Sequence, residues 1–343
     1  YARIKHNLRR NDITPEQGID QLERLRFAWR GDRFEAELLD NLADLYFETK
    51  QYALGLETLR QGISYFPEEA QNRQMMSRSS AVFRKLFLDG EADELSPISA
   101  ISLYYDFRDL TPLGNDGDLM IRRLASRLVS VDLLGRAADL LEYQVRARTE
   151  GAARAAIAAR LAQIYILDEK LDEALQILRA TREPRLPQDI EANRRHVESR
   201  ALIELERYEE AEVVLDGDNS SAAQYLRADA YWGGKQWKKL SSAVKRILGD
   251  GWRRNEPLTD LQRLNLVRLT IAMTFTEDRA GLIETRRRYG IQMREGDFAN
   301  AFELLTNDQE LSGRELGAIA GQIASVEKLQ SFMRDYRNDF SGR

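Results

Sequence analysis

The chain contains no cysteine, which excludes disulfides, thiolate nucleophiles and zinc–thiolate sites from its 343 residues. Its only two histidines, His6 and His196, lie far apart in the sequence, so no histidine-based metal site is predicted. A glycine-rich phosphate loop is missing, as is a strand for such a loop to follow. We therefore expect no catalytic residue, no metal and no cofactor, and predict that the protein is not an enzyme.

Proline is also scarce, with seven residues, so long helices can run between the breaks. No run alternates Val, Ile or Thr as a strand would, which predicts an all-α fold. No apolar run approaches the roughly 20 residues that cross a bilayer. The 51 basic and 56 acidic residues nearly balance, so we expect neither a membrane span nor a nucleic-acid partner.

The most informative stretch is 39–67, in which apolar and small residues recur at defined intervals. They are Leu39, Leu42, Ala43, Tyr46, Tyr52, Gly55, Leu59 and Gly62, followed by Pro67. This order resembles the tetratricopeptide repeat (TPR) family. The resemblance implies two antiparallel helices that pack through the small residues Ala43 and Gly55. A single helix pair cannot bury its own apolar face, so neighbouring pairs are expected.

The same spacing returns further along the chain. Ala125, Ala162 and Ser199 follow one another at intervals of 37 residues, each with its apolar companions. The matching sets are Leu124, Ala125, Leu128, Leu134, Ala137 and Leu141; Leu161, Ala162, Tyr165, Leu171, Ala174 and Leu178; Ser199, Leu202, Tyr208, Ala211 and Leu215; and Ala228, Tyr231, Trp237, Leu240 and Val244. The resemblance implies one continuous right-handed α-solenoid over residues 1–343.

We divide this expected array into five parts. Thr14 and Gln17 form a predicted capping box at the start of a helix that covers the first repeat. A final amphipathic pair, Leu316–Ile323 and Val326–Phe332, is expected to cap the far end. The parts are a linker and capping helix at 1–31, a TPR unit at 34–67, a degenerate helix pair at 70–117, three to four TPR-like units at 118–249, and degenerate repeats with the cap at 257–343.

In the TPR family, first-helix residues beside the small position line a groove. Carried onto this sequence, the resemblance gives an acidic first unit, with Glu37, Asp40, Asn41, Asp44 and Glu48. In the next three matching units it gives a predicted partner-binding groove of Arg122, Arg123, Arg160, Gln163, His196 and Arg200. The alternative is that these arginines pair with acids of their own helices and bind nothing.

Two further segments have alternative interpretations. Residues 216–220 resemble a calcium loop, but the twelfth position is Arg227 instead of glutamate, which predicts a turn. The basic runs 253–254 and 286–288 could contact phosphate, although runs of this kind on helices are more often solvated faces.

The resemblance implies a non-enzymatic scaffold or adaptor whose groove holds a segment of a partner protein, and the basic groove predicts an acidic peptide segment. The alternative is a structural subunit of a larger cell-envelope or motor assembly, which would use the convex face and the end helices. Similarity to bacterial multi-repeat TPR proteins implies the periplasm or cell envelope, with the cytoplasm as the alternative. The chain begins at Tyr1 in a polar stretch, so we expect it to continue a longer protein.

Overall fold

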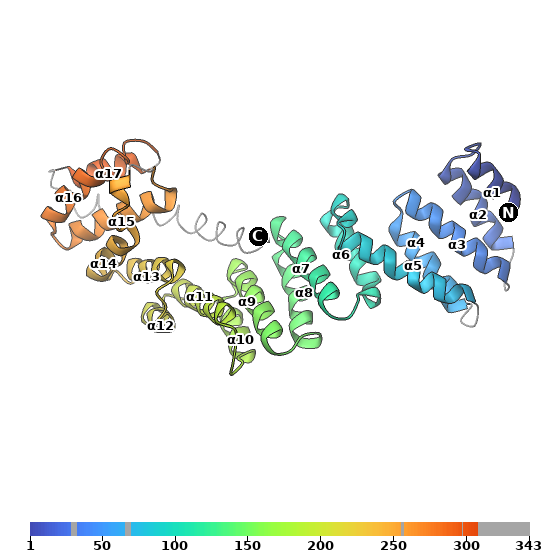
Figure 1. The fold of residues 1–343 in the computed structure, drawn as a ribbon, viewed down its shortest axis with the longest axis horizontal. Coiled ribbons are helices and arrows are strands. Elements are labelled where there is room, and N and C mark those ends of the chain that lie inside the picture. The colour runs from blue at the N-terminus through green and yellow to red at the C-terminus, as the bar shows by residue number, and fades with distance from the viewer. Residues whose placement is uncertain (29–32, 66–69, 255–256, 297, 308–343) are drawn as a thin grey trace. The chain divides into compact units, whose positions relative to one another are not determined.

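The computed structural model describes residues 1–28, 33–65, 70–254, 257–296 and 298–307 (Figure 1). These residues form α-helices and short 3-10 helices and contain no strand, which confirms the all-α prediction. The chain divides into two compact units, Tyr1–Leu140 and Leu141–Arg343. The predicted capping pair, Leu316–Ile323 and Val326–Phe332, lies outside the described residues. Within the described ranges, no helix has the length and apolarity needed to cross a membrane.

The capping box predicted at the start of the second helix is confirmed. The Thr14 N–H donates to Gln17 Oε1 at 3.0 Å, and the Gln17 N–H donates to Thr14 Oγ1 at 3.3 Å. The first five helices of this unit pack in chain order, and Leu22 of the second helix is 1% exposed. The elements of the unit are α1 (Ala2–Arg9), α2 (Pro15–Ala28), α3 (Arg33–Glu48), α4 (Tyr52–Tyr65), α5 (Ala70–Phe87), η1 (Glu91–Glu94), α6 (Pro97–Asp106), η2 (Arg108–Leu110), α7 (Asn115–Ser130) and the start of α8 (Leu134–Ala147).

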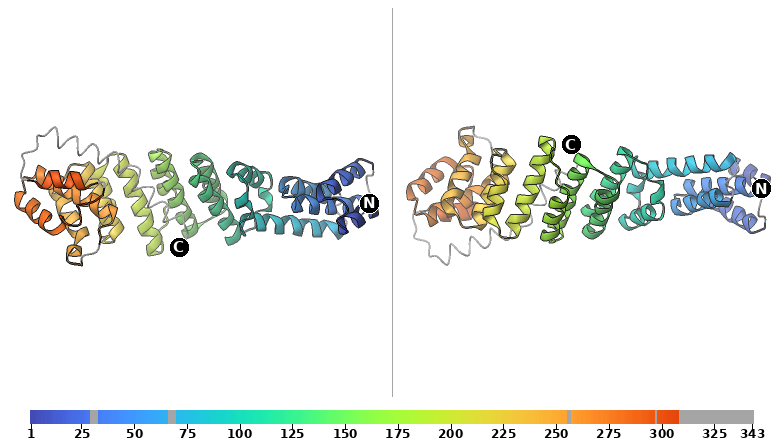
Figure 2. Two further views of the ribbon diagram at one scale, coloured as in Figure 1. Left: turned by 90° about the horizontal axis from the view of Figure 1, so that it is seen from above. Right: turned by 90° about the horizontal axis from the view of Figure 1, so that it is seen from below.

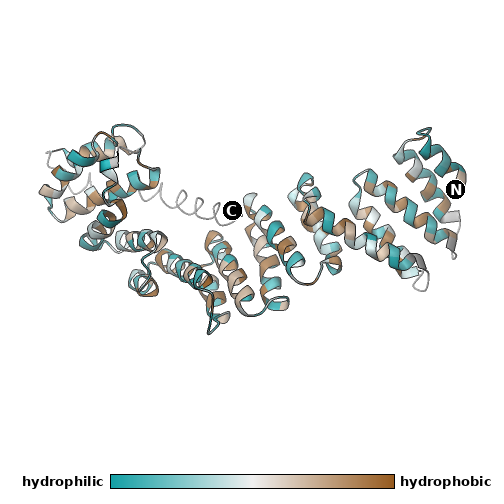
Figure 3. Cartoon of the chain, in the orientation of Figure 1, coloured by the Kyte–Doolittle hydropathy of each residue, from teal (hydrophilic) through white to brown (hydrophobic). Residues whose placement is uncertain are grey.

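In the second unit each helix packs against the next, and the first helices of successive pairs also touch. The pairs lie side by side in both views of Figure 2, from yellow-green to orange. Brown apolar and teal polar residues alternate around most of these helices, as an amphipathic array requires (Figure 3). The elements are α9 (Gly151–Leu167), α10 (Leu171–Ala180), α11 (Gln188–Glu204), α12 (Tyr208–Val214), α13 (Ser221–Gly233), α14 (Trp237–Leu248), η3 (Gly251–Arg254), α15 (Asp260–Phe275), α16 (Arg279–Tyr289) and α17 (Ala299–Thr306).

Small residues stand where the two helices of a pair approach each other. Ala43, Ala125, Ala162, Ser199 and Ala228 are all fully buried, at 0% exposure. In the partner helix α4, a Cβ atom built on Gly55 would overlap the ring of Phe47 in α3. The close approach predicted from the sequence is therefore confirmed, because larger side chains at these positions would push the helices apart.

Seven of the turns between helices have one recurring geometry. A non-glycine residue adopts the left-handed conformation, with φ between 53° and 62°. At Glu169, its N–H donates to Ile166 O at 3.2 Å and the Lys170 N–H donates to Tyr165 O at 2.8 Å. These two bonds define a Schellman motif. The same pair of bonds recurs at every such residue: Asn11, Lys50, Asp132, Glu169, Glu206, Lys235 and Glu277.

Counting from these turns assigns the register of a helix pair within residues 257–343, where the sequence predicted degenerate repeats. The small residue stands seven positions before the turn residue, as Ala162 does before Glu169 and Ser199 before Glu206. Thr270 holds that position before Glu277 and is fully buried in α15. Helices α15 and α16 therefore continue the register of the preceding pairs.

We expect Ala162→Leu or Ala174→Leu to lower the free energy of unfolding by about 1–3 kcal/mol, because each adds three carbons to a filled contact. Both alanines are fully buried in one apolar cluster with Leu178 and Val197. Urea titration followed by circular dichroism would measure the change. Ala153→Leu is the matched control, because Ala153 is exposed on the same helix α9. Equal midpoints for the buried and exposed substitutions would contradict this packing.

We expect Glu169→Gly to raise the free energy of unfolding by about 0.5 kcal/mol, since glycine adopts positive φ without strain. Glu169→Val should lower it by about 1 kcal/mol, because a branched Cβ makes the left-handed conformation less favourable. Thermal melts would measure both. Glu173→Gly, two residues into helix α10, should be destabilising, and a stabilising effect there would show that the turn conformation is not the cause.

Candidate functional site

Helix α11 carries two of the predicted groove residues on one face. His196 and Arg200 are separated by four residues, which places their side chains one turn apart. Each side chain is largely covered, with 20% exposed for His196 and 14% for Arg200. Both make polar contacts with the helix pair that follows in the chain. The groove residues on α11 are thus part of an interface between helix pairs.

Arg200 belongs to a charged triad that joins three helices. Its Nη1 lies 3.0 Å from Asp229 Oδ2 on α13, and Arg268 Nη1 on α15 lies 2.7 Å from Asp229 Oδ1. Burial raises the pKa of Asp229, but the two guanidiniums outweigh that effect and hold the pKa below its ordinary value. Two cations share one carboxylate, so the triad carries a net positive charge.

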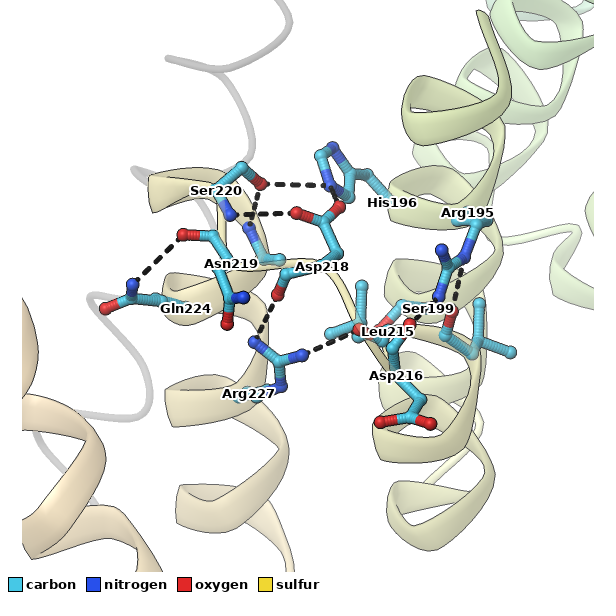
Figure 4. Close-up of polar contacts among 12 residues, drawn as sticks. Arg195, His196, Ser199, Leu215, Asp216, Asp218, Asn219, Ser220, Gln224 and Arg227 are labelled. Atoms are coloured by element: carbon cyan, nitrogen blue, oxygen red, sulfur yellow. Dashed lines mark hydrogen bonds and ion pairs between the residues drawn. The ribbon is translucent and has the colours of Figure 1, made fainter. Parts of the chain in front are cut away.

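His196 contacts the turn that precedes α13 (Figure 4). Its Nε2 lies 2.7 Å from Asp218 Oδ2, and the Ser220 N–H donates to Asp218 Oδ1 at 2.8 Å. Burial raises the pKa of Asp218, but hydrogen bonds from Ser220 and His196 outweigh this effect and lower the pKa to about 2. The Arg227 guanidinium donates to Asp218 O and Leu215 O. Residues 216–220 therefore form the predicted turn, fixed by side chains on both sides.

Arg160 and Gln163 lie on α9, which packs directly against α11. Both side chains are partly buried. Arg194 of α11 is 8% exposed and donates to Ala155 O of α9 at 2.7 Å and to Leu178 O of α10 at 2.5 Å. Arg194 thus joins α9, α10 and α11 through backbone carbonyls.

Arg122 and Arg123 belong to helix α7 of the first unit, whereas the other four groove residues belong to the second unit. Arg122 Nε donates to Asp118 O at 3.3 Å, and Arg123 Nη1 donates to Leu88 O. In the same unit, Arg78 of α5 forms ion pairs with Asp40 and Asp44 of α3. Arg78 of α5 therefore partly neutralises the face of α3 that the sequence predicts to be acidic.

The structure brings Arg160, Gln163, His196 and Arg200 onto two packed neighbouring helices of the second unit. The sequence analysis did not identify Asp229, Arg268 or Arg194 as part of this region. The sequence does contain a pattern that could have identified Asp229. Asp229 lies six residues before the turn residue Lys235, as Arg200 lies six residues before Glu206, so the two hold equivalent positions in successive pairs. Among the described residues, no group of three His, Asp or Glu side chains is placed to hold a metal ion.

No protein-family model and no curated protein matches this chain. The resemblance to tetratricopeptide repeats therefore stays a prediction, based on residue spacing.

We expect Asp229→Asn to lower the free energy of unfolding by about 3 kcal/mol, because it leaves two largely covered guanidiniums without their shared anion. Chemical denaturation would measure this. Asp172→Asn, at an exposed position of α10, should change the stability by less than about 0.5 kcal/mol. A double-mutant cycle with Arg200→Met should give a coupling energy above about 1 kcal/mol, and additive effects would contradict the triad.

Proposed function

We propose that this chain is a non-enzymatic, tetratricopeptide-like scaffold that binds an acidic segment of a partner protein along the face formed by α9 and α11. The observation that carries the proposal is that α9, which carries Arg160, packs against α11, which carries His196 and Arg200, and that Arg200 belongs to a triad of two cations and one anion. Such a surface attracts carboxylates, and the guanidinium group is suited to bind them in a bidentate manner.

The two arginines have different parts in this proposal. Asp229 holds the Arg200 guanidinium in place, so Arg200 contributes fixed positive charge with little loss of side-chain entropy on binding. Arg160 lies on the neighbouring helix, outside the triad, and supplies the direct contact with the peptide. An extended peptide held by a few such contacts binds with modest affinity that falls as salt rises.

The proposal is tested most cleanly at Arg160. A fluorescent polyglutamate peptide should bind the wild-type chain, and Arg160→Glu should weaken binding about tenfold and reduce its salt dependence. Fluorescence anisotropy at two salt concentrations measures both effects. Reversal of Arg200 would put a second carboxylate beside Asp229, so its effect on binding would be mixed with a loss of stability.

The matched control is Arg185→Glu, which makes the same change in charge at an exposed position between α10 and α11. It should bind the peptide nearly as tightly as the wild type. If Arg160→Glu binds as well as Arg185→Glu, the α9–α11 face is not the binding site.

The alternative function is that of a structural subunit. The observation that favours it is that second helices expose large aliphatic side chains, with Val213 of α12 72% exposed. Purification of the chain from its native cells distinguishes the two proposals. Folded subunits that stay bound to both Arg160→Glu and the wild type would favour an assembly role.

A further inference from the structure

Positive charge is concentrated in one part of the second unit. Residues 235–294 contain fourteen Lys or Arg and six Asp or Glu, a net charge of +8. The whole chain carries −5, so the other 283 residues carry −13. An asymmetry of this size within one chain points to a partner with negative charge for this part.

Helices α14 and α16 carry much of this charge, and side-chain contacts link α16 to the C-terminal half of α14 and to η3. Lys245 of α14 is 3.8 Å from Asp278, the N-cap residue of α16. At the other end of α16, the Arg288 guanidinium lies 4.9 Å from the centre of the Trp252 ring in η3, directly after α14. Contacts at both ends of α16 therefore hold this helix to the C-terminal half of α14 and to η3.

Several cations on these helices are available to a ligand. Leu240, Ala243 and Val244 form the buried face of α14, whereas Lys238 and Arg246 are exposed on its other side. In the described part of the chain neither cation forms an ion pair. Arg287 is likewise exposed on α16, where only Glu284, shared with Arg288, balances it.

An aliphatic side chain lies within this positive field. Ile283 is 65% exposed and stands four residues before Arg287, so both point outward from α16. We define the α14–α16 basic surface as Lys238, Lys245, Arg246, Arg253, Ile283 and Arg287. An exposed aliphatic residue among cations is the arrangement by which peripheral proteins bind anionic lipid interfaces.

We propose that the α14–α16 basic surface binds the surface of an anionic lipid bilayer. The cations lie at the level of the lipid phosphates, and Ile283 enters the boundary between headgroups and acyl chains. Each cation near such a surface strengthens binding, and salt weakens it within a Debye length.

Single-stranded nucleic acid fits this surface less well, because its binding sites use open aromatic faces for base stacking. Trp237 stacks on Phe275, with ring centres 4.7 Å apart and planes inclined by 9°. Trp252 has the Arg253 guanidinium at 5.1 Å from its ring centre in addition to Arg288. These stacking faces are already used within the chain.

The test is co-sedimentation of the full chain with vesicles made of equal parts phosphatidylglycerol and phosphatidylcholine. The wild type should bind them, should bind pure phosphatidylcholine vesicles at least about tenfold more weakly, and should dissociate as salt rises. Lys238→Glu combined with Arg287→Glu should reduce binding more than about tenfold. Ile283→Ser should reduce it about threefold, through lost apolar burial alone.

The matched control is Arg182→Glu combined with Arg185→Glu, which makes the same charge change at exposed positions of the same unit. Circular dichroism confirms that all variants are folded. Wild-type protein that does not bind the anionic vesicles, or equal loss in the test and control pairs, would overturn the proposal. So would wild-type protein that binds a single-stranded oligonucleotide or a polyglutamate peptide through Lys238 and Arg287 and leaves the vesicles unbound.

Discussion

The turn that closes most helix pairs is the constraint on which the rest of this structure depends. A residue in the left-handed conformation, fixed by two backbone hydrogen bonds, reverses the chain with the same local geometry at seven places. The residue seven positions earlier is buried at each of these turns, and in the pairs from α3 onward it is alanine, serine or threonine, whereas Ile4 holds the position before Asn11. Once the angle and the close contact are set, the remaining positions of each helix have fixed neighbours. The polar side chains of the first helices of successive pairs therefore meet, as Arg200 and Asp229 do.

Local signals in the sequence predicted much of this fold. The capping box of Thr14 and Gln17 and the buried positions of Ala43 and Ala162 depend on neighbours close in the chain, and the structure confirms them. Degenerate repeats were predicted at 257–343, but the register of the α15–α16 pair was missed, because Thr270 replaces the alanine and Arg279 replaces the apolar residue that begins other second helices. The turn residues were overlooked for a related reason. Glycine is the usual marker of a left-handed helix end, and here charged residues and one asparagine hold those positions instead.

The candidate site was predictable only in part. Register counting placed Arg160, Gln163, His196 and Arg200 on first helices, and the structure puts them on two packed helices. The ion-pair partners of predicted groove residues come from other helix pairs. Asp229 lies 29 residues after its partner Arg200, and Arg78 lies 34 residues after its partner Asp44 in the acidic first unit. Contacts between residues this far apart depend on how helix pairs stack on one another. The residue spacing within one pair does not specify that stacking. A comparison of equivalent positions between pairs would have placed Asp229 beside Arg200, because both precede their turns by six residues.

The shared carboxylate of Asp229 also bears on how the second unit unfolds. In an array of repeats, stability is commonly a sum of terms for single repeats and for adjacent repeats, so either end can fray alone. Arg200, Asp229 and Arg268 come from three successive helix pairs. Their ion pairs add a free-energy contribution that is complete only while all three helix pairs are folded. Unfolding of the central pair, α13–α14, removes Asp229 from both Arg200 and Arg268. Unfolding of either neighbouring pair leaves Asp229 with one of its two arginines. Amide hydrogens from α11 to α15 should consequently exchange as one cooperative block, in contrast to the gradual fraying expected of a simple linear array.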